Sequence, residues 1–371
     1  MIIFVNFIYM KLEFKYAVKF NFYILFVVFL AIEALLTRNL FFLLEENGMS
    51  KNDMKIIVSE ENTEVDIAIR RIDGTPAKIG NDNLFPVAVI IDNYQDARPN
   101  YGLSRASLVY ETYVENGTTR FLALYTPGTD NENKTEKIGP VRSARPYFLE
   151  IAKEYDALLA HSGGSSEALE KIKEWRVHDL EEIAWWGPDY FWRVYSRVSP
   201  HNLFTSEEKL RQAVTDFELA DNTPDYMAWR FGEGIKNNYV GDAHDIYIDF
   251  SLGTDFDAKY VYGASTGKYL RFQGNEKHID ALNGQQIVAD NIVVQFVPKE
   301  KILDANGRIS LSLHGIGKAL VFRDGKKIEA NWARGEGAKS RTVFYGKEEI
   351  VFKQGNIWIA IVPDDRDVAV D

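Results

Sequence analysis

The sequence predicts an α+β protein whose first half mixes helices and strands and whose second half is rich in strands. The apolar run FPVAVIID at 85–92 is typical of a strand that is covered on both faces. Amphipathic stripes at 146–155 and 166–175 predict helices in the first half. After residue 226, strand-like runs recur with glycine-containing turns between them, and no helical stripe of useful length appears. These observations favour an α/β domain with a central sheet, followed by a β-rich domain.

The length of 371 residues agrees with two domains. We expect an N-terminal α/β domain at 81–222 and a C-terminal β-rich domain at 226–363, followed by an acidic tail at 364–371. Residues 45–80 are polar and weakly patterned, so they are predicted to form a linker with one short strand at 65–69.

An apolar segment at 20–44 follows a lysine-containing stretch at 1–19. Because cations favour the cytoplasmic side, this bias predicts a cytoplasmic N-terminus and a body on the extracytoplasmic side of the cell membrane. The segment is only just long and apolar enough to span a membrane as a helix. It is either an uncleaved signal-anchor or a signal peptide cut near Ala34. The third possibility is a wrongly chosen start codon, with Met49 or Met54 as the first residue.

The composition excludes several classes of protein and site. The net charge is −11, and since residues 1–44 carry +2 the remainder carries −13, which makes nucleic acid an unfavourable partner. The sequence has no cysteine, which rules out disulfides, thiolate metal sites and cysteine nucleophiles. The six histidines show no metal-ligand spacing, and we expect no metal and no cofactor.

The remaining elements are predicted from apolar runs and stripes, and from a capping box formed by Thr205 and Glu208. In the first half they are strands at 108–115, 120–125 and 157–161 and a helix after Thr205. In the second half they are strands at 245–251, 268–273, 291–297, 309–314, 319–323, 342–345 and 358–362.

The dipeptide Asn116-Gly117 between two predicted strands is a strong hairpin signal. A two-residue turn places Arg120 diagonal to both Glu111 and Glu115 on one face of the hairpin. This group is either a cross-strand ion network that orders the sheet or a polar wall of a binding cleft, and the sequence favours neither. A three-residue loop would shift the register by one residue and dissolve the group.

Arg142 and Arg145, with Ser143 between them, lie just before a helix whose first residue is Pro146. A helix start carries partial positive charge and free N–H groups, so two guanidinium groups there require an anion between them. That anion is either a carboxylate of the protein or a ligand, and arginine suits bidentate recognition of carboxylate or phosphate. These residues are therefore candidates for an anion-binding site.

A second helix start follows the strand that ends at His161. The glycine pair Gly163 and Gly164 and the hydroxyl of Ser165 form either an anion nest or an ordinary capped turn. Alone, this turn favours the ordinary cap. With Asp92 at the end of a buried strand and the arginine pair, the site interpretation gains weight.

The aromatic stretch 190–204 follows a tryptophan pair and contains His201 and Asn202. It is either a hydrophobic lid that packs on the core or an aromatic wall of a site. His201, like His161, could act as an acid or a base, although a structural histidine is the commoner outcome. An S-x-x-K match begins at Ser206, where helix capping is the simpler explanation.

Several short motifs stand in a fixed order along the chain. They are PVAVIIDN (86–93), VYE (109–111), IGPVRSARPY (138–147), PHNLFT (200–205), GKALVFRDG (317–325) and WIAIVP (358–363). This series resembles the YerB-like family of bacterial envelope lipoproteins. The resemblance implies an α/β domain and a β-rich domain of unknown function, without an accepted reaction, cofactor or catalytic residue. Such lipoproteins carry a lipidated cysteine that this sequence lacks, so a tether here must be the apolar segment itself.

Two functions are compatible with these features. The first is a membrane-anchored extracytoplasmic cell-envelope protein that is a binding or scaffold module and not an enzyme. It would hold an anionic envelope ligand or a partner protein at the cleft of Arg142 and Arg145. The alternative is an envelope hydrolase or transferase that acts on a negatively charged polymer, with a histidine or carboxylate of the site as acid or base. We favour the first, because the sequence shows no complete catalytic constellation.

Overall fold

The structure is a computed structural model in which one compact unit, Asp66–Asp371, holds all the described residues. The described residues are 67–127, 135–183, 187–232, 239–250, 254–299, 301–305 and 307–371. The predicted cytoplasmic stretch at 1–19, the apolar segment at 20–44 and most of the linker at 45–80 lie outside them. Within the described ranges, no helix is long and apolar enough to cross a lipid bilayer.

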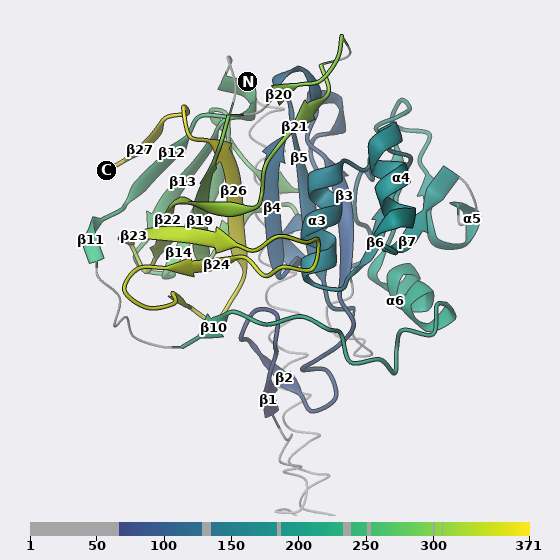
Figure 1. Ribbon diagram of the computed structural model, residues 1–371, viewed down its shortest axis with the longest axis horizontal. Coiled ribbons are helices and arrows are strands. Elements are labelled where there is room, and N and C mark those ends of the chain that lie inside the picture. Colours follow the sequence, from purple (N-terminus) through teal and green to yellow (C-terminus); the bar gives the residue numbers. More distant parts are fainter. Residues whose placement is uncertain are drawn as a thin grey trace, which may run out of the picture. The chain divides into compact units, whose positions relative to one another are not determined.

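One mixed sheet of eleven strands runs through the described unit (Figure 1). Its spatial order is β11 (Tyr239–Asp242), β23 (Lys326–Arg334), β22 (Gly315–Arg323), β19 (Asn291–Val297), β26 (Ile357–Pro363), β4 (Leu108–Tyr113), β5 (Thr119–Tyr125), β3 (Val87–Asp92), β6 (Leu158–His161) and β7 (His178–Glu181), with β24 (Val343–Tyr345) paired to β23. Strand β26 pairs in parallel with β19 on one side and with β4 on the other. The sheet therefore continues from the second half of the chain into the first without an open edge between them.

A second sheet and several short ribbons complete the β-structure. The second sheet consists of β15 (Glu276–Lys277), β14 (Lys268–Gln273), β13 (Ala258–Gly263), β12 (Asp245–Ile248) and β27 (Val368–Val370), with β18 (Val288–Ala289) paired to β14. The ribbons pair β1 (Ile67–Ile69) with β2 (Pro76–Lys78), β8 (Trp192–Arg193) with β9 (Leu203–Phe204), β10 (Arg230–Phe231) with β25 (Val351–Phe352), β16 (Ile279–Asp280) with β17 (Gln285–Gln286), and β20 (Lys301–Ile302) with β21 (Ile309–Ser310).

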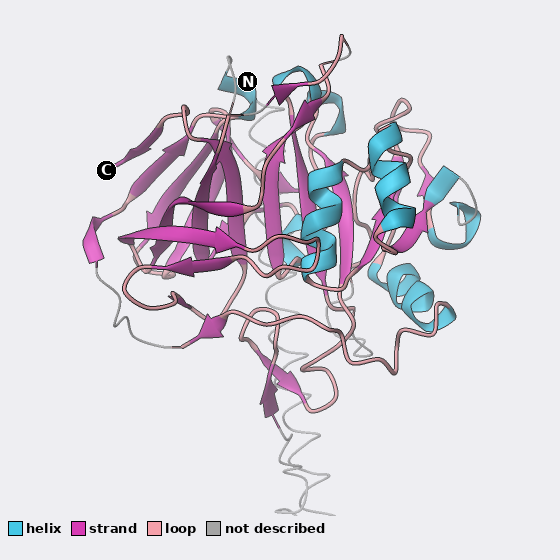
Figure 2. Ribbon diagram, in the orientation of Figure 1, coloured by secondary structure: helices cyan, strands magenta, loops and turns pink. Residues whose placement is uncertain are grey.

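The α-helices of the described residues gather at the end of the main sheet formed by β3, β6 and β7 (Figures 1 and 2). They are α3 (Pro146–Glu154), α4 (Ser166–Glu174), α5 (Gly187–Tyr190) and α6 (Glu207–Asp216). Helix α6 begins after Ser206, whose hydroxyl accepts a hydrogen bond from the N–H of Lys209 at 3.3 Å. The predicted capping box at Thr205 was therefore one residue too early, because the hydroxyl that caps the helix belongs to the next residue.

The α+β class predicted from the sequence is confirmed. All six residues of β3 are buried, as expected for a strand covered on both faces, and β14 and β19 occupy the predicted residues. Strands β7, β13 and β23 were not predicted. In β23, burial alternates along KKIEANWAR, but the inward positions include the small Ala330 and the charged Arg334. An alternation built on such residues is a weak hydrophobic signal.

The hairpin of β4 and β5 corrects a prediction. Its loop holds three residues, Glu115–Gly117, and the N–H of Val114 donates to the carbonyl of Thr118 at 2.9 Å. Arg120 consequently lies opposite Thr112, and Glu111 lies opposite Phe121. The predicted two-residue turn was wrong by one residue. Because side chains alternate between the faces of a strand, Glu111 and Arg120 project to opposite sides of the sheet.

Candidate functional site

Arg142 lies beside Asp92, the last residue of β3. Its Nε atom is 2.9 Å from Asp92 Oδ2, and the same oxygen is 2.7 Å from Nδ1 of His201. The other oxygen, Oδ1, accepts the N–H of Tyr94 at 3.0 Å. The backbone holds this group together, because Arg142 N donates to the carbonyl of Ile90 at 2.9 Å. One buried carboxylate thus joins an arginine and a histidine at the end of β3.

Arg145 and Arg120 share the second carboxylate, that of Glu115 in the β4–β5 loop. Arg145 Nε forms a short ion pair with Glu115 Oε1, and Arg120 Nη2 is 3.8 Å from Oε2. Arg120 Nη1 also donates to the carbonyl of Ser143 at 3.0 Å. The anion that the arginine pair required is therefore partly supplied by the protein: Asp92 accompanies Arg142, and Glu115 accompanies Arg145.

A pocket of about 510 Å³ opens beside these groups. We call it the arginine pocket, and it is lined by Tyr94, Gln95, Glu115, Asn116, Thr118, Arg120, Arg142 and Phe256. Phe256 belongs to the second half of the chain and the other residues to the first. The pocket therefore lies where the two halves meet, and two of the predicted arginines line it.

Positive charge exceeds negative charge within the ion-paired group beside this pocket. Arg120, Arg142 and Arg145 face two carboxylates, Asp92 and Glu115. Arg120 is only 7% exposed, and its Nε has no hydrogen-bond partner within the part of the chain that the structure describes. Burial, together with the neighbouring guanidinium groups of Arg145 and Arg142, lowers the pKa of Arg120 to about 10. An anion in the pocket would offset this repulsion and satisfy a buried donor.

Glu111 lies elsewhere, in a buried cluster between the main sheet and the second sheet. Its Oε2 accepts a hydrogen bond from Nη2 of Arg271 at 2.6 Å, and its Oε1 accepts one from Thr119 at 2.9 Å. Arg271 also donates to Gln273 at 2.9 Å and to His278. Burial raises the pKa of Glu111, although the charge of Arg271 opposes this shift. The cluster connects the two halves of the chain and is closed to solvent.

The second helix start is occupied by contacts within the protein. His161 is fully buried between Asp179, at 2.7 Å from Nε2, and the carbonyl of Gly163, at 2.8 Å from Nδ1. The N–H of Gly163 donates to Glu181, at 3.0 Å. Ser165 accepts the N–H of Ala168 at 3.2 Å as the N-cap of α4, and Gly164 forms a parallel bridge with Ala144. These residues do not line the arginine pocket.

The aromatic stretch contributes mainly through His201. Its ring stacks on Tyr94 with centroids 5.4 Å apart and an interplanar angle of 14°. Asn202 instead accepts a hydrogen bond from Arg193 at 3.1 Å and donates to the carbonyl of Val194. The tryptophan pair at 185–186 lies outside the described residues. His201 is thus connected to the pocket through Tyr94 and through Asp92.

Sequence reasoning missed several residues of the pocket. Tyr94 and Gln95 lie two and three residues after the end of the buried strand β3. The end of such a strand is a recurrent ligand position, so a local signal was present. Phe256 lies in a short 3-10 turn, Thr254–Phe256, with no pattern that distinguishes it from other aromatic residues. Only the folded chain brings it beside Arg142.

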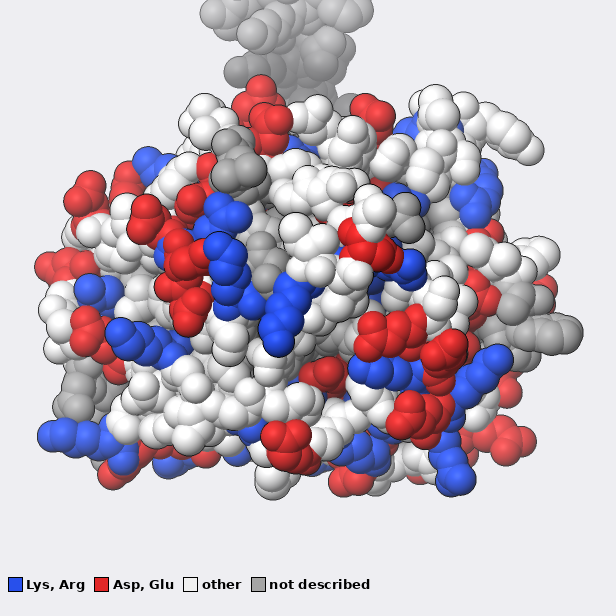
Figure 3. Space-filling view, turned by 45° about the horizontal axis from the view of Figure 1, so that its top comes forward, with Lys and Arg blue, Asp and Glu red and all other residues white. Residues whose placement is uncertain are grey.

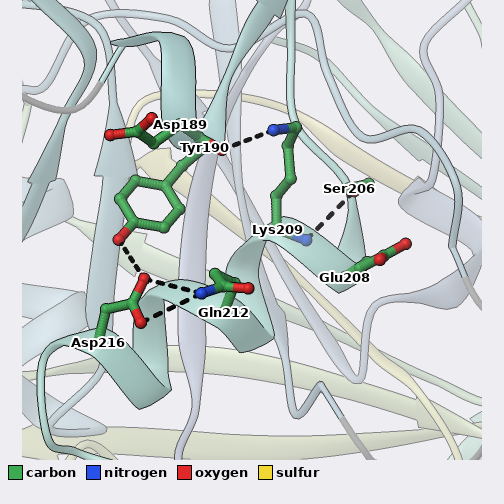
Figure 4. A pocket seen from close by; sticks show the side chains of 7 residues that line it. All are labelled: Asp189, Tyr190, Ser206, Glu208, Lys209, Gln212 and Asp216. Carbon is green, nitrogen blue, oxygen red and sulfur yellow. Dashed lines mark hydrogen bonds between the residues drawn. The ribbon is translucent and has the colours of Figure 1, made fainter.

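A second pocket of about 490 Å³ lies between α5 and α6 (Figure 4). The Tyr190 hydroxyl donates to Asp216 at 2.6 Å, and the Gln212 amide donates to both oxygens of the same carboxylate at 3.1 Å. Lys209 Nζ donates to the carbonyl of Asp189 at 2.5 Å, away from the hydroxyl of Ser206. These polar groups satisfy one another, so this pocket is a weaker candidate than the arginine pocket.

The surface charge and the metal-ligating side chains limit which kinds of ligand this protein can bind. On the face drawn in Figure 3, basic and acidic side chains lie next to one another, and neither sign forms a broad field. Within the described ranges, no three histidine, aspartate or glutamate side chains are grouped as a metal site would require. The arginine side chains that line the arginine pocket are of a type suited to bind carboxylate or phosphate.

The comparisons with known proteins agree on one family. Residues 74–220 match the family described as "Protein of unknown function (DUF3048) N-terminal domain", and residues 246–359 match its C-terminal domain. The chain is 29% identical over 282 residues to "Putative lipoprotein YerB" of Bacillus subtilis (strain 168), which spans 75% of this chain and 81% of that protein.

The fold is also that of a solved relative. The crystal structure of YerB protein from Bacillus subtilis matches with a TM-score of 0.71 and 26% identity, and the match covers 81% of this chain and 99% of the solved chain. The resemblance that the ordered motifs indicated is thereby confirmed, and the chain belongs to the YerB-like family, with a DUF3048 N-terminal domain followed by a DUF3048 C-terminal domain.

Proposed function

We propose that this protein is a membrane-anchored, extracytoplasmic cell-envelope protein that binds an anionic ligand in the arginine pocket. The observation that carries the proposal is the charge balance at Arg120, a buried cation with an unsatisfied Nε and two further arginines beside it. A ligand carboxylate or phosphate, or an acidic side chain of a partner protein, supplies the missing negative charge.

Two observations support the envelope location. The relative in Bacillus subtilis carries the name "Putative lipoprotein YerB", and the apolar segment at 20–44 with lysines before it has the composition of an export segment. Fractionation of cells that produce the full chain tests this part. We expect the protein in the membrane fraction and cleavage by protease added to cells whose wall has been removed. Recovery in the soluble cytoplasmic fraction would contradict the location.

Titration of the purified protein fragment of residues 66–371 with inorganic phosphate tests the binding proposal. We expect Arg142→Ala to raise the dissociation constant about tenfold, because one charge-assisted contact is worth about 1.5 kcal/mol or more. Arg145→Ala should weaken binding as well, since Glu115 then pairs more closely with Arg120. Circular dichroism checks that both variants unfold cooperatively.

The matched control is Arg193→Ala. Arg193 is paired with a carboxylate at 2.9 Å, that of Glu182, but it does not line the arginine pocket. Its removal should leave phosphate affinity unchanged. Equal affinity in the wild type, Arg142→Ala and Arg145→Ala would remove the anion site.

The hydrogen bond between Asp92 and His201 favours a second candidate function, an envelope hydrolase or transferase acting on a negatively charged polymer. A carboxylate that orients a histidine beside an anion-binding arginine is an arrangement used in general acid–base catalysis. In hydrolysis of a phosphodiester, water would attack the phosphorus and the bond to the leaving oxygen would break, while His201 would take the proton of the water and then give it to the leaving oxygen.

Bis(p-nitrophenyl) phosphate distinguishes the two candidates. The catalytic candidate requires release of nitrophenolate by the wild type and loss of that activity in His201→Gln. His178→Gln, which removes a histidine 3.7 Å from Asp156 and outside the pocket, is the control. Absence of turnover with retained phosphate binding favours the binding module.

A further inference from the structure

The volume of the arginine pocket indicates a ligand larger than a simple inorganic anion. A volume of about 510 Å³ lies in the usual range of small-molecule sites, about 300–1,000 Å³. The charged side chains of the lining are Arg120, Arg142 and Glu115, and the carboxylate of Glu115 is paired with Arg145 and Arg120. The remaining space is bordered by aromatic, amide and hydroxyl side chains, so the body of the ligand must suit those groups.

The two aromatic side chains of the pocket are held in place. Tyr94 is 44% exposed, and stacking on His201 fixes the orientation of its ring. The guanidinium carbon of Arg98 lies 5.0 Å from the centroid of the Phe256 ring. An exposed aromatic ring that cannot rotate away offers a flat apolar surface at low entropic cost, as is typical of binding sites.

The neutral polar groups of the pocket can both donate and accept hydrogen bonds. They are the amides of Gln95 and Asn116 and the hydroxyl of Thr118. Gln95 is itself tied to the second half of the chain, because its amide nitrogen donates to Asp255 at 2.5 Å. Amide and hydroxyl groups suit the hydroxyl groups of a ligand, which also donate and accept.

We propose that the ligand of the arginine pocket is a negatively charged saccharide, with its carboxylate or phosphate on Arg120 and Arg142 and a sugar ring against Tyr94 or Phe256. This inference rests on the proposed anion binding and extends it to a ligand class. An extended peptide fits less well, because peptides of that kind add to an open sheet edge, and β5, which carries Arg120, is paired on both sides by β3 and β4.

The test compares ligands that share the charge but differ in the body. The probes are inorganic phosphate, glucose 6-phosphate, a galacturonic acid trisaccharide and adenosine monophosphate, each titrated into residues 66–371. We expect the hexose phosphate, the trisaccharide or both to bind at least about tenfold more tightly than inorganic phosphate. The stronger of these two arms identifies the anionic group as phosphate or carboxylate.

Variants separate this inference from the proposed function. Phe256→Ala and Tyr94→Ala should weaken the preferred saccharide about three- to tenfold while leaving the affinity for inorganic phosphate unchanged. Arg142→Ala should weaken both ligands. Tyr195→Ala, which removes a fully exposed aromatic ring outside the pocket, is the matched control and should change neither.

Two outcomes would overturn the saccharide while leaving anion binding intact. One is equal affinity for inorganic phosphate and both saccharides. The other is tighter binding of adenosine monophosphate than of glucose 6-phosphate, which would assign the aromatic rings to a base. Failure of inorganic phosphate and of every saccharide to bind would instead overturn the proposed function, and this inference with it.

Discussion

Glu115 forms ion pairs with both Arg145 and Arg120, so its carboxylate would compete with an anion bound in the arginine pocket. Burial alone would raise the pKa of Glu115, but the hydrogen bond and charge of Arg145 outweigh it and hold the pKa below its ordinary value of 4.5. A depressed carboxyl pKa stabilises the folded state above the unfolded pKa, and this contribution is lost as the pH falls through the folded pKa.

We therefore expect Glu115→Gln to change both stability and binding. Below about pH 4.5 the free energy of unfolding should fall less steeply with decreasing pH in the variant than in the wild type, as measured by urea denaturation across the acid range. At neutral pH the variant should bind inorganic phosphate more tightly, because one competing negative charge is gone.

Glu276→Gln is the control for this change, since Glu276 is exposed on β15 and does not line the pocket. It should keep the wild-type pH profile and the wild-type affinity for phosphate. Identical acid profiles for the wild type and Glu115→Gln would show that the pairing with Arg145 does not persist in solution.

The β4–β5 loop is the element that places Glu115, Asn116 and Thr118 in the pocket. Asn116 and Gly117 both have positive φ, at 60° and 67°. Glycine adopts this conformation without the strain that a side chain brings, and nothing lies within 4 Å of a side-chain carbon built at Gly117. A substitution there costs conformational strain alone.

Gly117→Val should lower the free energy of unfolding by about 1–2 kcal/mol and also weaken phosphate binding, because the loop that carries Glu115 must adjust. Gly80→Val is a close control: its φ is 92°, the space around it is open, and it is not part of the pocket. It should cost a similar free energy and leave binding unchanged. Equal phosphate affinity in Gly117→Val and Gly80→Val would show that phosphate binding does not depend on the conformation of the β4–β5 loop.

At the scale of the whole molecule, several contacts join the region matched by the N-terminal family domain to the region matched by the C-terminal one. Strand β26 pairs with β4 inside the main sheet. The ion pair of Glu111 and Arg271 is closed to solvent, and breaking such a pair costs about 3–5 kcal/mol. Asp280 accepts the N–H groups of Gly102 and Ser104 at 2.9 and 2.8 Å.

These contacts predict that residues 66–371 unfold as one unit, although two family domains match the chain. Urea transitions followed by far-UV circular dichroism and by tryptophan fluorescence should coincide. Residues 66–222 produced alone should not unfold cooperatively, because β4 then presents an unpaired edge where β26 belongs. Two separate transitions, or a stable isolated fragment, would show that each family domain folds independently at the boundaries expected near 222 and 226.

Local signals in the sequence predicted a large part of the fold and of the candidate site. Patterns only a few residues long predicted the buried strand β3 and the helix α3, which begins at Pro146. They also placed Arg142 and Arg145 just before that helix. Even the need for a negative partner at Arg142 and Arg145 follows from the charge of a helix start. Such inferences hold because the interacting groups are neighbours along the chain.

Only the tertiary structure decided which groups meet those arginines. The partner of Asp92 at His201 lies 109 positions away, and Phe256 reaches the pocket from the other half of the chain. The β4–β5 register, which separates Glu111 from Arg120, depended on a single additional loop residue. Contacts between distant residues depend on the packing of the whole sheet, and no local pattern encodes them. The sequence therefore predicted where the arginines lie along the chain, and only the tertiary structure determined which residues surround them.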